Sequence, residues 1–169
     1  MKLLIICNYQ VDYVDGSLGF PKAKEIEDLI IESLKDYDDF LFLLDSFDDD
    51  FINSYNYKML PVKRCIKGTL GIEVYGKLKD YLDKAKAVIY KDDYASLDLI
   101  KFLKDNPSYE EIDLCGISSH QSVFVNAIIA KSTCPNSLVV LKKNLTRSFD
   151  TSLEAKAYNI LNSLLIEVK

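Results

Sequence analysis

The chain has 169 residues, 49% hydrophobic and 28% charged, a balance that predicts one globular domain over residues 1–169 rather than a disordered or fibrous chain. Its net charge of −5 argues against nucleic acid as a partner, because phosphate binding needs clustered lysine and arginine. The cysteines show no CxxC spacing and are interpreted as reduced thiols. No signal-peptide pattern and no membrane-length apolar run occurs, so we expect a cytoplasmic protein without membrane contact.

Apolar runs and helical spacing alternate along the chain. In order, they predict strand 2–7, helix 22–35, strand 40–44, helix 72–82, strand 87–90, helix 95–104, strand 112–115, helix 120–131, strand 137–141, helix 151–162 and strand 164–168. A long connection separates the second strand from residue 71. Such alternation implies right-handed crossovers, so the predicted fold class is α/β: a three-layer α/β/α Rossmann-like fold with a six-stranded, mostly parallel sheet.

Polar residues that directly follow the predicted strands are the first candidates for a functional site. In parallel sheets, ligands bind outside the carboxyl ends of the strands, where the chain order reverses. Asn8 and Gln10 follow the first strand, Lys91 follows the third, and residues 116–122 follow the fourth. These positions are therefore the ones to weigh.

Lys91 directly follows the apolar run 87–90, so its ammonium would project from the carboxyl edge of a central strand. A partly desolvated lysine there can polarise a substrate or transfer a proton. The alternative is a solvated lysine beside Asp92 and Asp93. Position alone leaves both interpretations open.

Ser122 lies in the first turn of the predicted helix 120–131, where free backbone N–H groups favour an anion. A nucleophile or an oxyanion site could be built there. The alternative is that Ser118 and Ser119 are N-caps and Ser122 is simply a small helix residue.

His120, the only histidine, lies in the same turn and could act as a general base or contact a ligand. A single histidine excludes a multi-histidine zinc site. Four aspartates follow the second strand: Asp45, Asp48, Asp49 and Asp50. They could bind a hard metal, but such a run is more often a solvated loop. We expect no metal and no cofactor, since the glycine-rich phosphate-binding motifs GxGxxG, GxxxxGKS and GxxxxGKT are absent too.

Four segments match, in order and with compatible spacing, the motifs of one known family: residues 5–26, 60–74, 87–96 and 112–131. The first resembles an opening strand with an aspartate-x-glutamine-asparagine-aspartate-phenylalanine motif, and the second a segment with proline, histidine-cysteine and glycine-threonine. The third resembles a strand ending in a catalytic lysine, and the fourth a strand and helix that present a nucleophilic cysteine. In these features the chain resembles the isochorismatase-like cysteine hydrolases, which include nicotinamidases and many small amidases.

The resemblance implies a catalytic triad of aspartate, lysine and cysteine, of which only the lysine is kept. The three positions are Asn8, Lys91 and Ser122 in this chain. Asp12, the second aspartate of the opening motif, is mainly structural in the family. The family often has a non-proline cis peptide that builds its oxyanion hole, and the resemblance places it at Ile117-Ser118.

The resemblance also implies a pocket and, in nicotinamidases, a metal site. The implied pocket residues are Gln10, Tyr13, Phe47, Arg64 and His120. Of the nicotinamidase metal ligands, Asp45 is kept, whereas Phe47 and Arg64 replace histidines, which puts that metal site in doubt.

Two functions follow as expectations. The first is a catalytically impaired or repurposed relative that binds a small ligand or a protein partner through the same fold; Arg64 and His120 would suit an anionic ligand. The second is an active hydrolase of a small amide or an isochorismate-like vinyl ether with altered chemistry; Asn8 is the feature against it. We expect a small-molecule ligand or substrate, and the resemblance implies a homo-oligomer, a dimer or tetramer.

Overall fold

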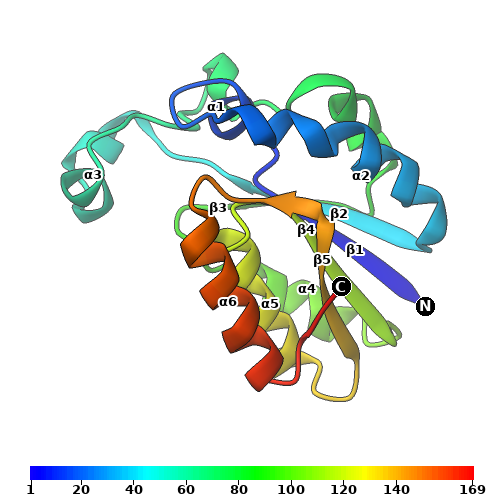
Figure 1. Cartoon of the computed structure of the whole chain (residues 1–169). Helices are drawn as coiled ribbons and strands as arrows, with labels where there is room; N and C mark the ends of the chain where they lie inside the picture. Colours follow the sequence, from blue (N-terminus) through cyan, green and yellow to red (C-terminus); the bar gives the residue numbers. More distant parts are fainter.

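A six-stranded sheet runs through the computed structural model, which describes residues 1–169 (Figure 1). The strands are β1 (Lys2–Cys7), β2 (Asp39–Asp45), β3 (Ala87–Lys91), β4 (Glu111–Ile117), β5 (Leu138–Arg147) and β6 (Glu167–Val168). Their order is β3-β2-β1-β4-β5-β6, and every neighbouring pair is parallel. The predicted α/β class with six strands is confirmed, and the sheet is wholly parallel.

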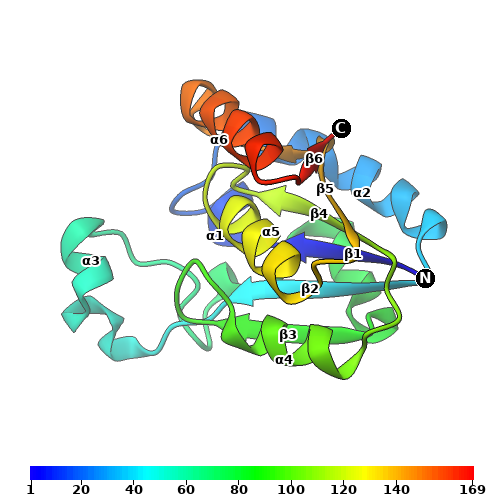
Figure 2. The ribbon, with the colours of Figure 1, turned by 90° about the horizontal axis from the view of Figure 1, so that it is seen from below.

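Helices cover both faces of this sheet, which gives three layers (Figures 1 and 2). One face carries α4 (Leu97–Asp105), α5 (Ser122–Thr133) and α6 (Thr151–Ser163). The other face carries the 3-10 helix η1 (Pro21–Ile26), then α2 (Glu27–Ser33), η2 (Leu34–Asp36) and the 3-10 helix η5 (Gly76–Lys84). Successive residues of a strand point to opposite faces. Leu3 and Ile5 therefore join the first core and Leu4 and Ile6 the second, which explains why β1 is apolar throughout.

Four short helices lie in segments for which the sequence predicted only turns and connections. They are α1 (Val11–Val14), η3 (Asp49–Asn53), α3 (Tyr55–Met59) and η4 (Leu70–Ile72). The segment around α3, residues 52–63, projects from the body of the molecule in both views (Figures 1 and 2) and contains no buried residue. We call it the arm. It has no amphipathic pattern to predict it, because only Tyr57 packs against a hydrophobic cluster, the small one that includes Phe51.

The predicted helix 72–82 is wrong over its first part, because the backbone there pairs with the segment that follows β1. The N–H of Val11 donates to Glu73 O, and the N–H of Tyr75 donates to Tyr9 O, both at 2.9 Å. Val74 and Gln10 form an antiparallel bridge between these bonds. Only after this bridge does the chain turn into η5, which is 3-10 rather than α-helical.

The two last strands differ in length from the prediction. β5 extends to Arg147 because its pairing with β4 shifts register: Leu114 pairs with Leu141, whereas Gly116 pairs with Thr146. The polar residues that bulge out between these pairs look like a loop in the sequence. β6 has only two residues, because the N–H of Leu164 still donates to Ile160 O of α6. None of the helices is long and apolar enough to span a bilayer.

Candidate active site

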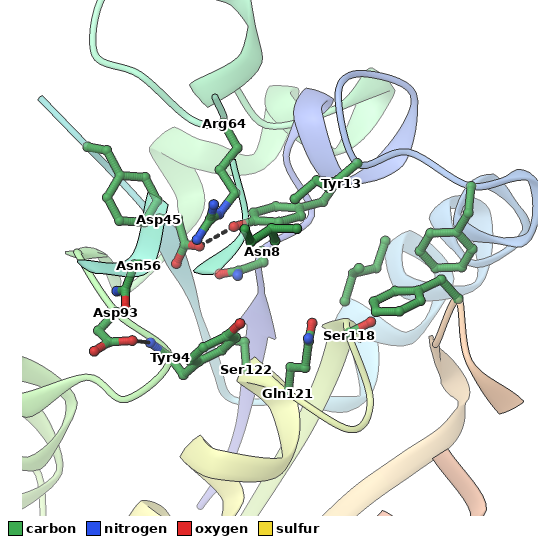
Figure 3. Close-up of a pocket in the computed structure, with 16 residues that line it drawn as sticks. Asn8, Tyr13, Asp45, Asn56, Arg64, Asp93, Tyr94, Ser118, Gln121 and Ser122 are labelled. Atoms are coloured by element: carbon green, nitrogen blue, oxygen red, sulfur yellow. Dashed lines mark hydrogen bonds between the residues drawn. The ribbon is translucent and has the colours of Figure 1, made fainter. Parts of the chain in front are cut away.

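A cavity of about 220 Å³ opens at the carboxyl ends of the central strands (Figure 3). It lies where the order of the chain reverses between β1 and β4, the place where parallel sheets bind ligands. Residues selected from the sequence that line it are Asn8, Tyr13, Asp45, Phe47, Arg64, Ile117, Ser118 and Ser122. Gln10, Lys91 and His120 do not line it.

Asn8 follows β1 directly and lies at the floor of the cavity. Its backbone has a φ of 49°, in the left-handed region that asparagine tolerates better than most residues. Its N–H donates to Leu43 O of β2 at 2.9 Å, which fixes the residue to the sheet edge. Its Oδ1 is buried and accepts no hydrogen bond. Buried polar atoms in proteins are nearly always hydrogen-bonded. This unpaired oxygen is therefore available to accept a hydrogen bond from a ligand.

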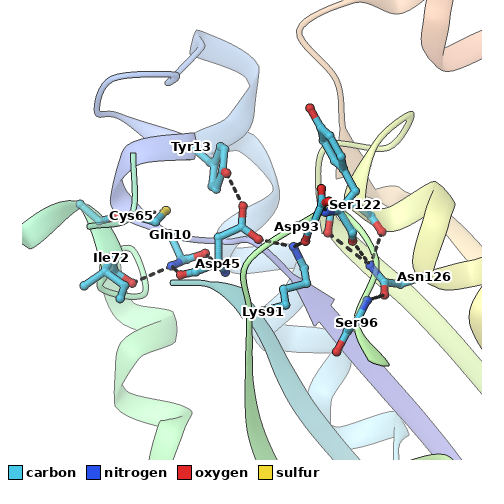
Figure 4. A network of polar contacts seen from close by, with 12 residues as sticks. Gln10, Tyr13, Asp45, Cys65, Ile72, Lys91, Asp93, Ser96, Ser122 and Asn126 are labelled. Carbon is cyan, nitrogen blue, oxygen red and sulfur yellow. Dashed lines mark hydrogen bonds and ion pairs between the residues drawn. The ribbon is translucent and has the colours of Figure 1, made fainter. Parts of the chain in front are cut away.

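Lys91 and Asp45 form a buried ion pair (Figure 4). The ammonium of Lys91 donates to Asp45 Oδ1 and to Asp93 O, the latter at 3.0 Å. The hydroxyl of Tyr13 donates to Asp45 Oδ2. Burial, and next the Asp45 carboxylate, raise the pKa of Tyr13 well above its ordinary value, so it remains a hydroxyl donor. Both oxygens of Asp45 are thus occupied by side chains of the protein.

Gln10 supports this network from behind the cavity. The fully buried side chain donates from Nε2 to Asp45 O and Ile72 O at 2.8 Å each, and its Oε1 accepts the N–H of Asp45 at 2.8 Å. Asp12 also fixes a backbone segment, because its Oδ2 accepts the N–H of Cys65 at 2.7 Å. These two residues hold the segments that carry Asp45 and Arg64.

Ser122 is the first residue of α5 and is 1% exposed. The side chain of Asn126 lies one turn along the helix and donates to Ser122 O at 2.8 Å and weakly to Ser122 Oγ at 3.4 Å (Figure 4). The same amide donates to Tyr94 O at 2.8 Å, and its Oδ1 accepts the N–H of Ser96 at 3.0 Å. Asn126 therefore ties the loop after β3 to the start of α5, and Tyr94 of that loop lines the cavity.

The turn between β4 and α5 forms the wall opposite the arm. The peptide bond Ile117-Ser118 is cis. Ser118 is 5% exposed, and its Oγ has no hydrogen-bond partner. The side chains of Asn8 and Ser118 thus supply two of the three buried polar atoms in the chain that lack a partner, and both residues line this cavity.

Arg64 reaches the cavity from the segment that follows the arm. The residue is 6% exposed, and its guanidinium carbon lies 5.3 Å from the ring centre of Phe47 and 4.8 Å from that of Phe51. Cation–π contacts of this kind hold the guanidinium plane without using its N–H donors. Its one hydrogen bond within the protein runs from Nη1 to Val62 O at 3.3 Å.

His120 lies outside the cavity wall, on the far side of the turn from Ser122. Its Nδ1 lies 2.7 Å from Ser148 Oγ, and its ring packs edge-on against Phe149. Burial lowers the pKa of His120, against the opposing effects of Asp150 and Glu154. A neutral ring in this place stabilises the loop that ends β5.

No thiol lines the cavity. Cys7 is the nearest in sequence to Asn8, but it is fully buried in the sheet, and burial raises its pKa to about 12. Burial also raises the pKa of Cys65, whose Sγ donates to Gly71 O at 3.7 Å. A thiolate nucleophile is therefore absent from the lining of this cavity.

The residues present do not fit a metal ion at the position that the family resemblance implies. Both carboxylate oxygens of Asp45 already accept hydrogen bonds, from Lys91 and Tyr13. The ring of Phe47 offers no ligand atom, and the guanidinium of Arg64 beside this ring would repel a metal cation. Nowhere in the chain do three or more histidine, cysteine, aspartate or glutamate side chains gather around a possible metal position.

Sequence reasoning missed seven of the 16 residues that line the cavity. The missed lining residues are Leu18, Phe20, Asn56, Leu60, Asp93, Tyr94 and Phe149, whereas Gln121 lies within the candidate segment 116–122. Asp93 and Tyr94 follow β3 as closely as Lys91 does, and that position was the available signal. Asn56 and Leu60 belong to the arm, where no motif or periodicity marks them.

The fold and this cavity together define an α/β protein with a cavity at the carboxyl edge of a parallel sheet. Solved structures of nicotinamidases and pyrazinamidases match the chain over its full length. The nicotinamidase from Bacillus subtilis is 29% identical, with a TM-score of 0.82, covering 99% of this chain and 98% of that one. The pyrazinamidase of Pyrococcus horikoshii in complex with zinc is 20% identical, with a TM-score of 0.85 and coverage of 99% and 98%.

A third match is PnC1 from L. infantum in complex with nicotinate, which is 22% identical, with a TM-score of 0.85 and coverage of 100% and 92%. No model of a protein family matches the sequence, and no curated protein does. The chain therefore has the fold of these enzymes from end to end, at low sequence identity.

Proposed function

We propose that this chain is a member of the isochorismatase and nicotinamidase family in which the usual catalysis is impaired or repurposed, and that its cavity binds a small molecule. The observation that carries the proposal is that Asn8 and Ser122 line the same cavity. The family resemblance assigns these two positions to an aspartate and a cysteine. The full-length similarity to nicotinamidases supports the family assignment.

The chemistry of the two substitutions favours impairment. An asparagine amide cannot take a proton near neutral pH, and a serine hydroxyl needs an adjacent base more than a thiol does. Lys91 is engaged with Asp45 and does not supply that base. Loss of such a unit lowers turnover by several powers of ten and leaves only binding and oxyanion donors.

An active hydrolase of a small amide or an isochorismate-like substrate is the second candidate. It is favoured by the hydroxyls of Ser118 and Ser122, which line the same cavity as Asp45, the partner of Lys91, because hydroxyl donors there can still polarise a carbonyl. The complex of the L. infantum protein with nicotinate suggests pyridine carboxamides as the first substrates to try.

The experiment is hydrolysis of a panel with nicotinamide, pyrazinamide, small carbamoyl compounds and isochorismate. Wild type is compared with the Asn8→Asp/Ser122→Cys double variant and with Lys91→Ala. Lys86→Ala is the matched control, because Lys86 carries the same charge in an exposed pair with Asp39. We expect no wild-type turnover and measurable turnover in the double variant.

Turnover by wild type that Lys91→Ala abolishes and Lys86→Ala preserves would instead establish a working enzyme with altered chemistry. Absence of turnover in all variants, together with no binding of any panel compound by calorimetry, would contradict the proposed small-molecule site.

A further inference from the structure

The buried guanidinium of Arg64 lacks a counter-ion. No carboxylate oxygen of the chain lies within 4.0 Å of it, and four of its five N–H donors have no partner in the protein. A buried charge is costly unless it is paired and hydrogen-bonded. Arg64 is 6% exposed, yet it lines the cavity, so a ligand can reach the donors that the protein leaves free.

The carboxylates near Arg64 make their contacts with other groups. Asp45, which lines the cavity, accepts from the side chains of Lys91 and Tyr13, and Asp12, which lines a second pocket beside Arg64, accepts the backbone N–H groups of Cys65 and Ser17. The Asp45–Lys91 pair is neutral as a unit. Arg64 therefore has no ion-pair partner within the protein.

The aromatic contacts of Arg64 prepare it for a flat anion. The guanidinium lies over the rings of Phe47 and Phe51, with its carbon 5.3 and 4.8 Å from the ring centres. Its edge remains available for two parallel N–H donors, the geometry that matches a carboxylate. Figure 3 shows Arg64 reaching into the cavity above Asn8.

The rest of the cavity selects the body of the ligand. Phe20, Tyr94 and Phe149 contribute aromatic lining, which suits a planar apolar body in a space of about 220 Å³. Asp93 lies on a different wall from Arg64 (Figure 3) and would repel a second anionic group. The free Oδ1 of Asn8 can accept a hydrogen bond from the ligand, and the hydroxyl of Ser118 can donate or accept one.

We propose that Arg64 anchors the carboxylate of a small aromatic monoanion in the proposed small-molecule site, on which this inference rests. The site binds this anion without a metal ion. Arg64 and Phe47 stand where the family resemblance implies metal ligands. The chain thus has a fixed organic cation where a metal-binding relative would have an inorganic one.

The test compares benzoate with benzamide, which have the same shape and differ in charge, by isothermal titration calorimetry in the presence of EDTA. We expect wild type to bind benzoate at least about tenfold more tightly than benzamide, and Arg64→Gln to bind both equally. Arg64→Lys should give an intermediate ratio, because an ammonium cannot make the two parallel bonds. Lys63→Gln is the matched control: it removes the same charge from the adjacent, exposed residue and should keep the wild-type ratio.

A second measurement needs no pocket variant. Arg64 and Arg147 are the only arginines in the sequence, so a protein labelled with ¹⁵N-arginine gives two Nε–H signals. Arg147→Lys assigns them by removing one. We expect benzoate to shift the Arg64 signal and leave the Arg147 signal in place, and isophthalate to bind more weakly than benzoate.

Three results would overturn the inference: equal wild-type affinity for benzoate and benzamide, a preference for benzoate that survives Arg64→Gln, or binding that requires added zinc. If benzamide binds and benzoate does not, the inference alone fails and the proposed small-molecule site stands. If neither compound binds and no panel compound binds either, both fail.

Discussion

Lys91 and Asp45 occupy paired positions on the neighbouring strands β3 and β2, and their side chains form a buried ion pair between the two strands. The parallel register brings both side chains to the same edge of the sheet. The lysine therefore neutralises Asp45, while Asn8 one strand away has no charge to offer it. This relationship makes the pair a structural centre of the site, whatever chemistry remains.

Breaking the Lys91–Asp45 pair should strongly destabilise the fold. Lys91→Met leaves a buried carboxylate without its cation, and such a loss typically costs about 3–5 kcal/mol. Urea denaturation measures the free energy of unfolding. The Asp45→Asn/Lys91→Met double variant, which removes both charges, should lose less than the single variant. Equal loss in the two would show that the ion pair is not what stabilises this region.

Gln10→Met should destabilise the protein although the residue never touches the cavity. The substitution keeps the volume but leaves the N–H of Asp45 and the carbonyls of Asp45 and Ile72 unpaired. Buried unpaired groups cost about 1–3 kcal/mol each, so a loss of about 2–5 kcal/mol is expected after partial relaxation. A loss below about 1 kcal/mol in thermal and urea unfolding would mean that water replaces the amide.

Gly116→Ala should prevent folding. Gly116 has a φ of 104°, and an added Cβ would lie 2.0 Å from Cys7 O in the backbone of β1. Neither strand can move, because both are central in the sheet. Gly68→Ala is the matched control, since Gly68 also has a positive φ, of 77°, but open space around its Cβ. It should cost only about 1 kcal/mol; soluble, cooperatively unfolding Gly116→Ala protein would refute the expected clash.

Asp113→Asn should change how stability depends on pH. Burial raises the pKa of Asp113 above the ordinary 3.8, although Tyr37 donates to its Oδ2 at 2.6 Å and Lys142 lies 3.6 Å away. Between pH 3.8 and the native pKa, the native state therefore binds more protons than the unfolded state. The contribution of Asp113 to the free energy of unfolding therefore falls as pH rises through that interval and is constant above it.

The asparagine variant has no such proton to lose. Its free energy of unfolding, relative to wild type, should increase with pH from about pH 3.8 and then level off, which urea titrations at a series of pH values can follow. Parallel pH profiles for the two proteins would show that Asp113 does not titrate differently in the folded chain.

Sequence patterns predicted the helices and strands that bury apolar faces. They did not predict the segments whose structure depends on backbone hydrogen bonds rather than on apolar burial. β1 and β2 were predictable because both faces of each strand are covered, which leaves unbroken apolar runs. The extension of β5 was hidden because its bulge places Lys142 and Lys143 in the middle of a strand. The antiparallel bridge of Val74 with Gln10 has no sequence signature at all.

The candidate site divides in the same way. Asn8, Ser118 and Ser122 could be found because each follows a recognisable strand, and Arg64 because its segment matches a family motif. The engagement of Lys91 with Asp45 could not be predicted, since it depends on the register between β2 and β3. The aromatic wall of Phe20 and Phe149 joins residues from distant parts of the chain, and only the folded chain brings these rings together, 6.3 Å apart.

The arm, residues 52–63, separates the shape of the cavity from the stability of the fold. None of its residues belongs to the two large cores, and only Tyr57 packs against the small cluster that includes Phe51, so most substitutions in the arm should cost little stability. Two of its residues, Asn56 and Leu60, nevertheless form part of the cavity wall. Substitutions at these two positions can therefore change what the cavity accepts while the sheet and its buried network stay in place.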